Sequence, residues 1–284
     1  MVNDEGPEER WSSAGTAPTE YLRQVFDALF KRVEQSTVVV GFYDEADCEL
    51  KHGTGTCIVM NDHWLIATAG HHFVREPLPS HVGLWAPTMP KDQRVPAVLT
   101  HREGGLKRAP TDLAWLEVEP GYALELGRRF LTIDQLAPSF PKDGGEHLFI
   151  FGYAGEPTIS DGDGGSPAFG LSAAGHWSTS IESSTIDPRH RPNPDIDIFM
   201  RYTRAVDDPV FGGLSGSGLW APNLRSGAPW SPESARLVGV QHEALDAGRW
   251  VRGTRISHWL RPLADLYPDL RADVEHALAQ ERNV

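Results

Sequence analysis

Short apolar runs separated by turn residues fill the chain from about residue 37 to residue 260. Their length and their β-branched content are typical of strands joined by irregular loops. The predicted strands lie at 38–40, 57–60, 64–67, 95–99, 113–118, 148–153, 196–202 and 237–241. No helical period of any length separates these runs, which argues against a parallel α/β sheet and favours antiparallel barrels or a sandwich.

Helical spacing occurs near the two ends of the chain instead. Apolar side chains recur every three or four residues over 19–33, which predicts an amphipathic helix. The same spacing returns over 257–280, where we expect Pro262 and Pro268 to divide the segment into a short turn and a final helix. Residues 1–18 are acidic and rich in Gly, Pro and Ser, so we expect a mobile tail.

Composition and charge narrow the class of protein. Of 284 residues, 40% are apolar and 23% are charged, which excludes a coiled coil, a collagen-like fibre and a wholly disordered chain. The formal net charge of −13 repels phosphate backbones, so we expect no nucleic-acid partner. We see no polybasic run, no signal peptide and no apolar run of about 20 residues, so we expect no membrane contact and a cytoplasmic location.

Neither the thiols nor the acidic turns indicate a metal site. Cys48 and Cys57 are too few for a disulfide scaffold or a thiolate zinc site. Their spacing fits facing strands of a hairpin, but two separate thiols in a reducing compartment are the simpler interpretation. The turn at 161–166 alternates carboxylates without the closing glutamate of a calcium loop. The 12 histidines form no compact ligand cluster, so we predict no metal and no cofactor.

Three local motifs carry candidate chemistry because they occur together. A strand at 65–69 runs into Gly70 and His71, an aspartate at Asp112 heads a second apolar strand, and Ser215 lies inside a glycine-rich turn. A serine hydroxyl needs a base to remove its proton, and an imidazole held by a carboxylate supplies one. Glycines on both sides of a serine let backbone N–H groups converge where an oxyanion develops. Asp134 is a weaker substitute for the carboxylate.

With these motifs, the chain resembles the trypsin/chymotrypsin-like serine peptidases, and especially their bacterial members. The likeness lies in Thr68-Ala69-Gly70-His71, in Asp112-Leu113-Ala114 and in Gly213-Leu214-Ser215-Gly216-Ser217, and it spans roughly residues 37–262. The order His, Asp, Ser is that of this family and differs from the orders of subtilisins and α/β-hydrolases. An α/β-hydrolase elbow also requires a glycine where Ser217 stands.

The resemblance implies a fold, a division of the chain and a set of roles. The fold would be all-β, with two antiparallel six-stranded β-barrels, an N-terminal helix and a C-terminal helix. His71 would be the general base, Asp112 its orienting carboxylate and Ser215 the nucleophile, with the N–H groups of Gly213 and Ser215 forming the oxyanion hole. The implied segments are a tail at 1–18, a helix and first barrel at 19–136, a linker at 137–147, a second barrel at 148–262 and a helix at 263–284.

The resemblance is compatible with two hypotheses about the residue that is preferred before the cut bond. The strand that ends at Gln241, with the next residues His242 and Glu243, resembles the segment along which this family binds substrate as an added strand. Asp208 and Pro209 lie where the family builds its pocket floor, and an acid there would favour Lys or Arg before the cut bond. Gln241 and His242 line the opposite wall and would favour an acidic or polar residue instead.

Three departures from the family pattern bear on regulation. Leu214 stands where digestive members carry the aspartate that pairs with a new amino terminus, Gly218 replaces a usual proline, and His72 replaces a disulfide cysteine. We therefore expect a serine endopeptidase acting on protein or peptide substrates, with narrow specificity or a regulatory protein partner, in a bacterial stress or defence pathway. The alternative is a catalytically silent fold that binds peptides or proteins without cutting them.

Overall fold

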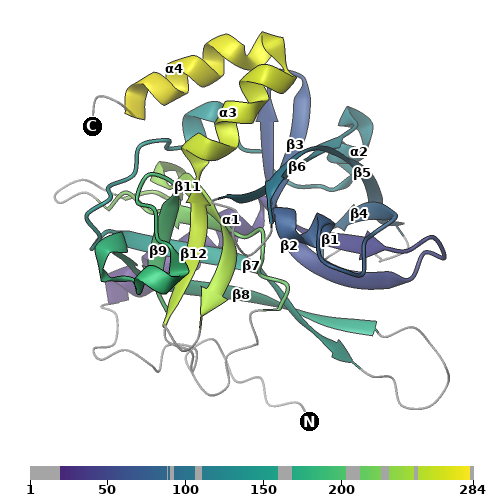
Figure 1. The fold of residues 1–284 in the computed structure, drawn as a ribbon, viewed down its shortest axis with the longest axis horizontal. Helices are drawn as coiled ribbons and strands as arrows, with labels where there is room; N and C mark the ends of the chain where they lie inside the picture. The colour runs from purple at the N-terminus through teal and green to yellow at the C-terminus, as the bar shows by residue number, and fades with distance from the viewer. Residues whose placement is uncertain are drawn as a thin grey trace.

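Two barrels form the body of the molecule. The computed structural model describes residues 20–87, 89, 93–105, 111–158, 168–202, 212–224, 230–245 and 249–281. Within them, twelve strands form two closed six-stranded barrels that lie side by side, antiparallel throughout (Figure 1). The expected all-β, two-barrel fold with an N-terminal and a C-terminal helix is therefore confirmed. The tail at 1–18 and the acidic turn at 161–166 lie outside the described residues.

The first barrel has the strand order β1-β2-β3-β6-β5-β4. Its strands are β1 (Thr37–Tyr43), β2 (Glu49–Met60), β3 (His63–Thr68), β4 (His81–Trp85), β5 (Val95–Gly104) and β6 (Asp112–Val118). β1 is buried on both faces because Val38, Val40 and Phe42 point into one apolar cluster while Val39 and Tyr43 point into another. This accounts for its continuous β-branched run, and the short helix α2 (Pro120–Glu125) follows the last strand.

The second barrel has the order β10-β11-β12-β9-β8-β7. Its strands are β7 (His147–Thr158), β8 (Ala168–Ile181), β9 (Asp197–Arg201), β10 (Gly218–Ala221), β11 (Arg236–Leu245) and β12 (Trp250–Arg255). Residues 137–146 connect the barrels without a helix or strand. Each of the eight predicted runs overlaps a strand, although the run at 196–202 extends one residue beyond β9 at each end. The strands β4, β8, β10 and β12 were not predicted.

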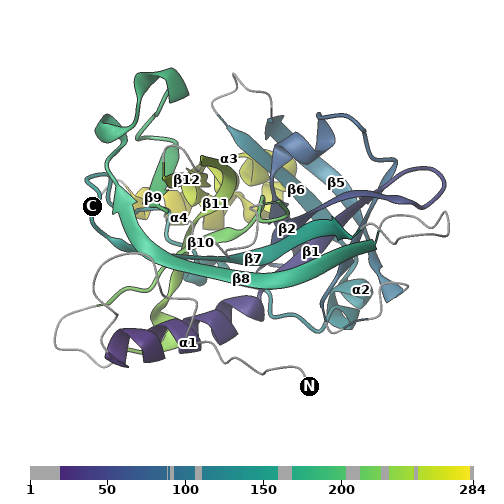
Figure 2. The ribbon, with the colours of Figure 1, turned by 90° about the horizontal axis from the view of Figure 1, so that it is seen from below.

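The amphipathic helix predicted at 19–33 is confirmed as α1 (Glu20–Glu34). In Figure 2 it lies along the lower edge of the view, next to β7 and β8. Phe26 and Phe30 meet Phe149 and Phe151 edge to face, with ring centroids 5.2 and 4.7 Å apart. Leu29 is fully buried in the same apolar cluster, so the apolar face of α1 completes the core rather than remaining free.

The C-terminal segment joins both barrels. It consists of α3 (Ile256–Leu266), a 3₁₀ turn (Pro268–Leu270) and α4 (Arg271–Glu281). The predicted division at Pro262 is wrong, because α3 continues through that residue and ends before Pro268. Packing explains this tolerance, since Trp259, Leu260 and Leu263 are fully buried around it. The indole N–H of Trp115 on β6 donates to the carbonyl of Trp259 at 2.9 Å.

Two smaller findings complete the fold. Cys48 and Cys57 do not form a disulfide. Across the described part of the chain, we find no helix that is long and apolar enough to cross a membrane.

Candidate active site

His71 and Asp112 form a closely bonded pair at one end of the first barrel. β3 ends at Thr68, and the following 3₁₀ turn (Gly70–Phe73) carries His71 to the first residue of β6. The ring Nδ1 of His71 lies 2.8 Å from Asp112 Oδ2, and the backbone N–H of His71 donates to Asp112 Oδ1 at 2.7 Å. A Cβ at Gly70 would lie 2.7 Å from the carbonyl of Leu113, so glycine lets the turn approach β6. Both oxygens of the carboxylate therefore orient one histidine.

The environment keeps this carboxylate charged. Burial by itself raises the pKa of the Asp112 carboxyl, but hydrogen bonds from His71 and the nearby ring of His242 outweigh it and hold the pKa below its usual value. A charged carboxylate bonded to Nδ1 leaves Nε2 of His71 as the nitrogen able to accept a proton. The carboxylate thus fixes the orientation of the His71 ring.

His72 is buried next to this pair and does not face solvent. Its ring stacks on Phe42 with centroids 4.7 Å apart and contacts the ring of His71 at 4.3 Å. Burial first, and the neighbouring His71 next, lower the pKa of His72 well below its usual value, so the ring is neutral. A Cβ at Gly53 would lie 2.6 Å from its Nε2, which leaves room only for glycine there. His72 therefore packs behind His71 as a neutral support.

Ser215 lies in a turn that two glycines in the left-handed region make possible. Gly213 has φ +90° and Gly216 has φ +97°. The carbonyl of Ser215 accepts the N–H of Thr54 at 2.8 Å, and the N–H of Gly216 donates to the carbonyl of Gln241 at 2.8 Å. A Cβ at Gly216 would lie 1.8 Å from the carbonyl oxygen of Thr54. Backbone contacts to both barrels thus hold the turn.

Two backbone N–H donors at this turn make no hydrogen bond with another described residue. The carbonyl of Gly212 accepts the N–H of Gly155 at 3.0 Å, and the carbonyl of Gly213 accepts the Thr54 hydroxyl at 2.8 Å. Because N–H and C=O of one peptide unit point in opposite directions, the N–H of Gly213 faces away from Gly155. None of the hydrogen bonds between described residues uses the N–H of Gly213 or of Ser215.

Thr54 on β2 links the Ser215 turn to the strand that leads to His71. Its hydroxyl accepts the N–H of Tyr153 at 3.0 Å and donates to Gly213. Its carbonyl accepts the hydroxyl of Thr68 at 2.8 Å, three residues before His71. Sequence reasoning missed Thr54. The alternating small residues of Gly53-Thr54-Gly55-Thr56 were the available signal, since they permit close approach of a second backbone.

Ser215 lies beside the turn that carries His71 and His72, but its side chain makes no hydrogen bond to His71 among the described residues. The carbonyl of Ser215 and the ring of His72 both lie within 3.1 Å of one Cβ position built at Gly53. Among the described residues, no hydrogen bond joins Ser215 Oγ to His71 Nε2. Such bonds are commonly long in substrate-free sites and tighten when substrate binds.

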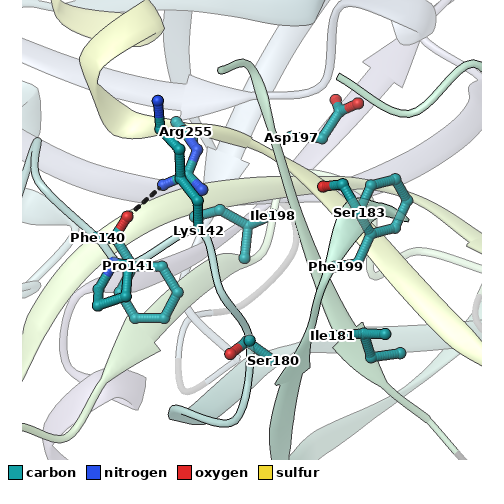
Figure 3. Close-up of a pocket in the computed structure, with 11 residues that line it drawn as sticks. Phe140, Pro141, Lys142, Ser180, Ile181, Ser183, Asp197, Ile198, Phe199 and Arg255 are labelled. Carbon is teal, nitrogen blue, oxygen red and sulfur yellow. Dashed lines mark hydrogen bonds between the residues drawn. The ribbon is translucent and has the colours of Figure 1, made fainter. Parts of the chain in front are cut away.

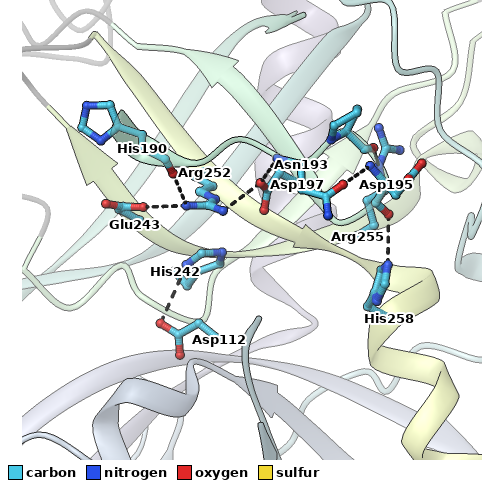
Figure 4. Close-up of polar contacts among 11 residues, drawn as sticks. Asp112, His190, Asn193, Asp195, Asp197, His242, Glu243, Arg252, Arg255 and His258 are labelled. Atoms are coloured by element: carbon cyan, nitrogen blue, oxygen red, sulfur yellow. Dashed lines mark hydrogen bonds and ion pairs between the residues drawn. The ribbon is translucent and has the colours of Figure 1, made fainter. Parts of the chain in front are cut away.

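The candidate substrate residues differ in where they point. Gln241 is buried, whereas Glu243 is partly exposed and faces the guanidinium of Arg252 at 3.4 Å. The ring of His242 faces Asp112, with Nδ1 3.7 Å from Oδ2 (Figure 4). Asp208 and Pro209 lie outside the described residues.

A small pocket elsewhere in the second barrel contains none of these residues (Figure 3). Arg255 crosses its edge and donates to the carbonyl of Phe140 at 2.7 Å and to that of Pro194 at 2.9 Å. The first bond ties the linker between the barrels to β12, and the second ties β12 to the turn before β9, which is a structural role. No group of three or more His, Cys, Asp or Glu side chains able to hold a metal occurs within the described ranges.

Comparisons with known proteins agree with this architecture. No family model matches the chain. No curated protein matches it in sequence. Among solved structures, it is similar to the Rv3671c protease from M. tuberculosis in its active form, at 18% identity over 89% of this chain and 88% of that chain, with a TM-score of 0.51. It is also similar to Deg5, at 15% identity over 88% of this chain and 99% of that chain, with a TM-score of 0.53. A serine endoprotease from Yersinia pestis matches at 14% identity over 89% of this chain and 69% of that chain, with a TM-score of 0.50.

These likenesses show the fold. The chain has the two-barrel fold of the trypsin-like serine proteases.

Proposed function

We propose that this protein is a trypsin-like serine endopeptidase. The observation that carries the proposal is the His71–Asp112 pair, with Nδ1 2.8 Å from Oδ2, beside the glycine turn of Ser215, where two N–H groups donate to no other described residue. His71 takes the Ser215 proton at Nε2 as Oγ attacks the peptide carbonyl, and Asp112 stabilises the imidazolium that forms. The N–H groups of Gly213 and Ser215 receive the oxyanion.

The second half of the reaction uses the same groups. The imidazolium returns its proton to the leaving amine, which departs and leaves an acyl group on Ser215. Water then enters and attacks the acyl carbonyl while His71 removes its proton. The imidazolium returns that proton to Ser215 Oγ as the acyl–oxygen bond breaks, which releases the acid product and restores the hydroxyl. No cofactor enters these steps.

The substrate is proposed to bind as an added strand along β11. β10 pairs with β11 no further than Val240, and Gln241 bonds to Ser217. Among the described residues, no strand pairs with the same edge beyond Gln241, whereas β12 occupies the opposite edge. A free strand edge next to the nucleophile favours an extended peptide rather than a small molecule.

We further propose restricted activity, through narrow specificity or a regulatory partner, in the cytoplasm of a bacterium under stress or attack. Leu214 supports this: it is buried against the position of Gly152, so no carboxylate is present there to pair with a new amino terminus. Without that switch, restraint must come from substrate choice or from a partner. Free digestion of generic unfolded protein by the purified chain would sink this part of the proposal.

The experiment is cleavage of a diverse peptide pool, read by mass spectrometry, with the wild type beside the Ser215→Ala variant. We expect new termini with the wild type and none with the variant. The silent binding module is the second candidate, favoured by the missing bond from Ser215 Oγ to His71. Peptides retained by both proteins and cut by neither would establish that candidate instead.

A further inference from the structure

Arg252 on β12 lies beside the strand edge where the peptide is proposed to bind. Gln241 pairs with Gly253 and Glu243 pairs with Arg252, so His242 is the extra residue of a β-bulge in β11. Residues that are paired across antiparallel strands present their side chains on one face of the sheet. The bulge therefore brings the Arg252 guanidinium and the Glu243 carboxylate together, at the part of β11 whose other edge is free among the described residues.

The guanidinium of Arg252 is held in place by a buried partner. Its Nη2 lies 2.8 Å from Oδ2 of Asp197 on β9, and the Asp197 side chain has no exposed surface. Its Nη1 donates to the carbonyl of His190 at 3.3 Å, and the ring centroid of Phe199 lies 5.7 Å from the guanidinium carbon. Only 11% of the Arg252 side chain is exposed. The cation therefore has a fixed position, as recognition of a ligand requires.

Arg252 has more hydrogen-bond donors than the protein's own acceptors satisfy. A guanidinium carries five N–H groups in a planar fork. The Nε group is buried and makes no hydrogen bond with another described residue. The Nη1 group lies 3.4 Å from Glu243 Oε2, and 42% of the Glu243 side chain is exposed. Because exposed ion pairs contribute little, Glu243 is a loosely held partner that a stronger acceptor can displace.

The guanidinium also lies close to the candidate active site. Burial lowers the pKa of His242 to about 4, the charge of Asp112 opposes this shift, and the charge of Arg252 adds to it. Figure 4 shows the His242 ring between Asp112 and Arg252, with Nδ1 3.7 Å from Asp112 Oδ2. A peptide that extends along β11 toward Ser215 therefore passes close to the guanidinium.

Two kinds of substrate side chain match these charges, and the donors favour one of them. A basic side chain would pair with Glu243 but would leave the buried Nε of Arg252 without an acceptor. An acidic side chain supplies that acceptor and displaces only an exposed carboxylate. A buried donor without an acceptor costs more free energy than an exposed ion pair contributes, so the acidic side chain is favoured.

We infer that Arg252 selects substrates with Asp or Glu before the cut bond, because its guanidinium donates to that carboxylate in place of Glu243. The inference names the substrate class of the proposed peptidase and rests on that proposal for cleavage. Binding of the peptide does not require Ser215 to react, so the preference is measurable separately.

The first test measures binding. The Ser215→Ala variant is titrated with matched peptide pools that carry Asp, Asn or Lys at each position in turn. We expect Asp to bind about 10-fold more tightly than Asn at one position, and Lys to bind most weakly there. Tighter binding of Lys, or binding that ignores charge, would overturn the inference. If the wild type shows the Asp preference but cuts no peptide, the peptidase proposal fails and the inference stands.

The second test separates the two charges by the sign of the effect. Glu243→Gln removes the competing carboxylate and should increase the preference for Asp over Asn by about 2- to 5-fold. A site that selects Lys through Glu243 would lose its preference instead. Glu233→Gln is the control, because Glu233 is exposed in another turn.

The third test removes the guanidinium without leaving a buried charge unpaired. Arg252→Met alone would strand the Asp197 carboxylate, so it is combined with Asp197→Asn, and circular dichroism verifies the fold. In this double variant the ratio of Asp to Asn binding should fall to about 1. A preference for Asp that persists in the folded double variant would contradict the role of Arg252.

Discussion

The two barrels build their halves of the candidate site in different ways. On the first barrel, side chains define the geometry: both oxygens of Asp112 bond to His71, and His72 supports the ring from behind. On the second barrel, the backbone defines it: glycine conformations and carbonyl contacts hold Ser215. His71 is thus held by hydrogen bonds that a single substitution can remove, whereas Ser215 is held by a backbone conformation that a single added methyl group can disrupt.

The largest expected loss of activity follows from a change in the His71–Asp112 pair on the first barrel. Asp112→Asn presents an amide N–H₂ to Nδ1 and favours the tautomer that protonates Nε2, so kcat should fall by about 10⁴-fold with the fold intact. Peptide hydrolysis and circular dichroism measure the two. Asp134→Asn is the control, because Asp134 is exposed in another turn. Comparable activity in both variants would remove Asp112 from the site.

At the Ser215 turn of the second barrel, we expect one added carbon to reduce both stability and activity strongly. Gly216→Ala places a Cβ 1.8 Å from the carbonyl oxygen of Thr54 in a turn with φ +97°. We expect a loss of at least about 3 kcal/mol in unfolding free energy and of about 100- to 1000-fold in activity. Gly121→Ala is the matched control, since no atom lies within 4 Å of its Cβ. If both variants unfold at the same denaturant concentration, the turn is not held as described.

A substitution at Thr54 tests the contacts that join the first barrel to the Ser215 turn of the second. Thr54→Val keeps the shape but leaves the N–H of Tyr153 and the carbonyl of Gly213 without their partner, which should cost about 1–3 kcal/mol of stability. Activity should also fall, because the oxyanion turn loses an anchor. Thr56→Val should be close to neutral, because the Thr56 hydroxyl has no hydrogen-bond partner among the described residues. If Thr56→Val lowered the unfolding free energy more than Thr54→Val, Thr54 would not link the two barrels as described.

The smallest effect concerns pH. His242 takes up a proton near pH 6.5 when unfolded and only near pH 4 when folded. The unfolded chain then binds more protons between these values, so stability is complete above pH 6.5 and falls as the pH drops toward 4. His242→Asn should weaken this dependence, measured by urea unfolding at pH 7 and pH 5. The buried His72 ring should account for the pH dependence of stability that remains in the variant. If His242→Asn leaves the dependence unchanged, the His242 ring is exposed to water rather than buried.

Local pattern predicted much of the fold because buried strands must be apolar and α1 must be amphipathic. β8 escaped because its alternation is diluted by small residues such as Ser172 and Gly175, and β10 because it has only four residues. Pro262 was misread because tertiary packing holds a helix that local chemistry disfavours.

The residues of the candidate site also fall into those that local sequence patterns predict and those that they do not. His71, Asp112 and Ser215 stand in motifs with a recognisable order. Thr54 acts through a partner 159 residues away, and the aim of His242 depends on a bulge that no local pattern records. Contacts between barrels are set by the assembled fold, and the residues that make them cannot be read one segment at a time.

Labelling with a fluorophosphonate probe tests most directly whether the two halves form one working site. The probe reacts with a serine that its base and oxyanion donors have activated. We expect one adduct on the wild-type protein, mapped by peptide mass spectrometry to Ser215, and none on Ser215→Ala or His71→Ala. No adduct on the folded wild type, or an adduct on another residue, would contradict it.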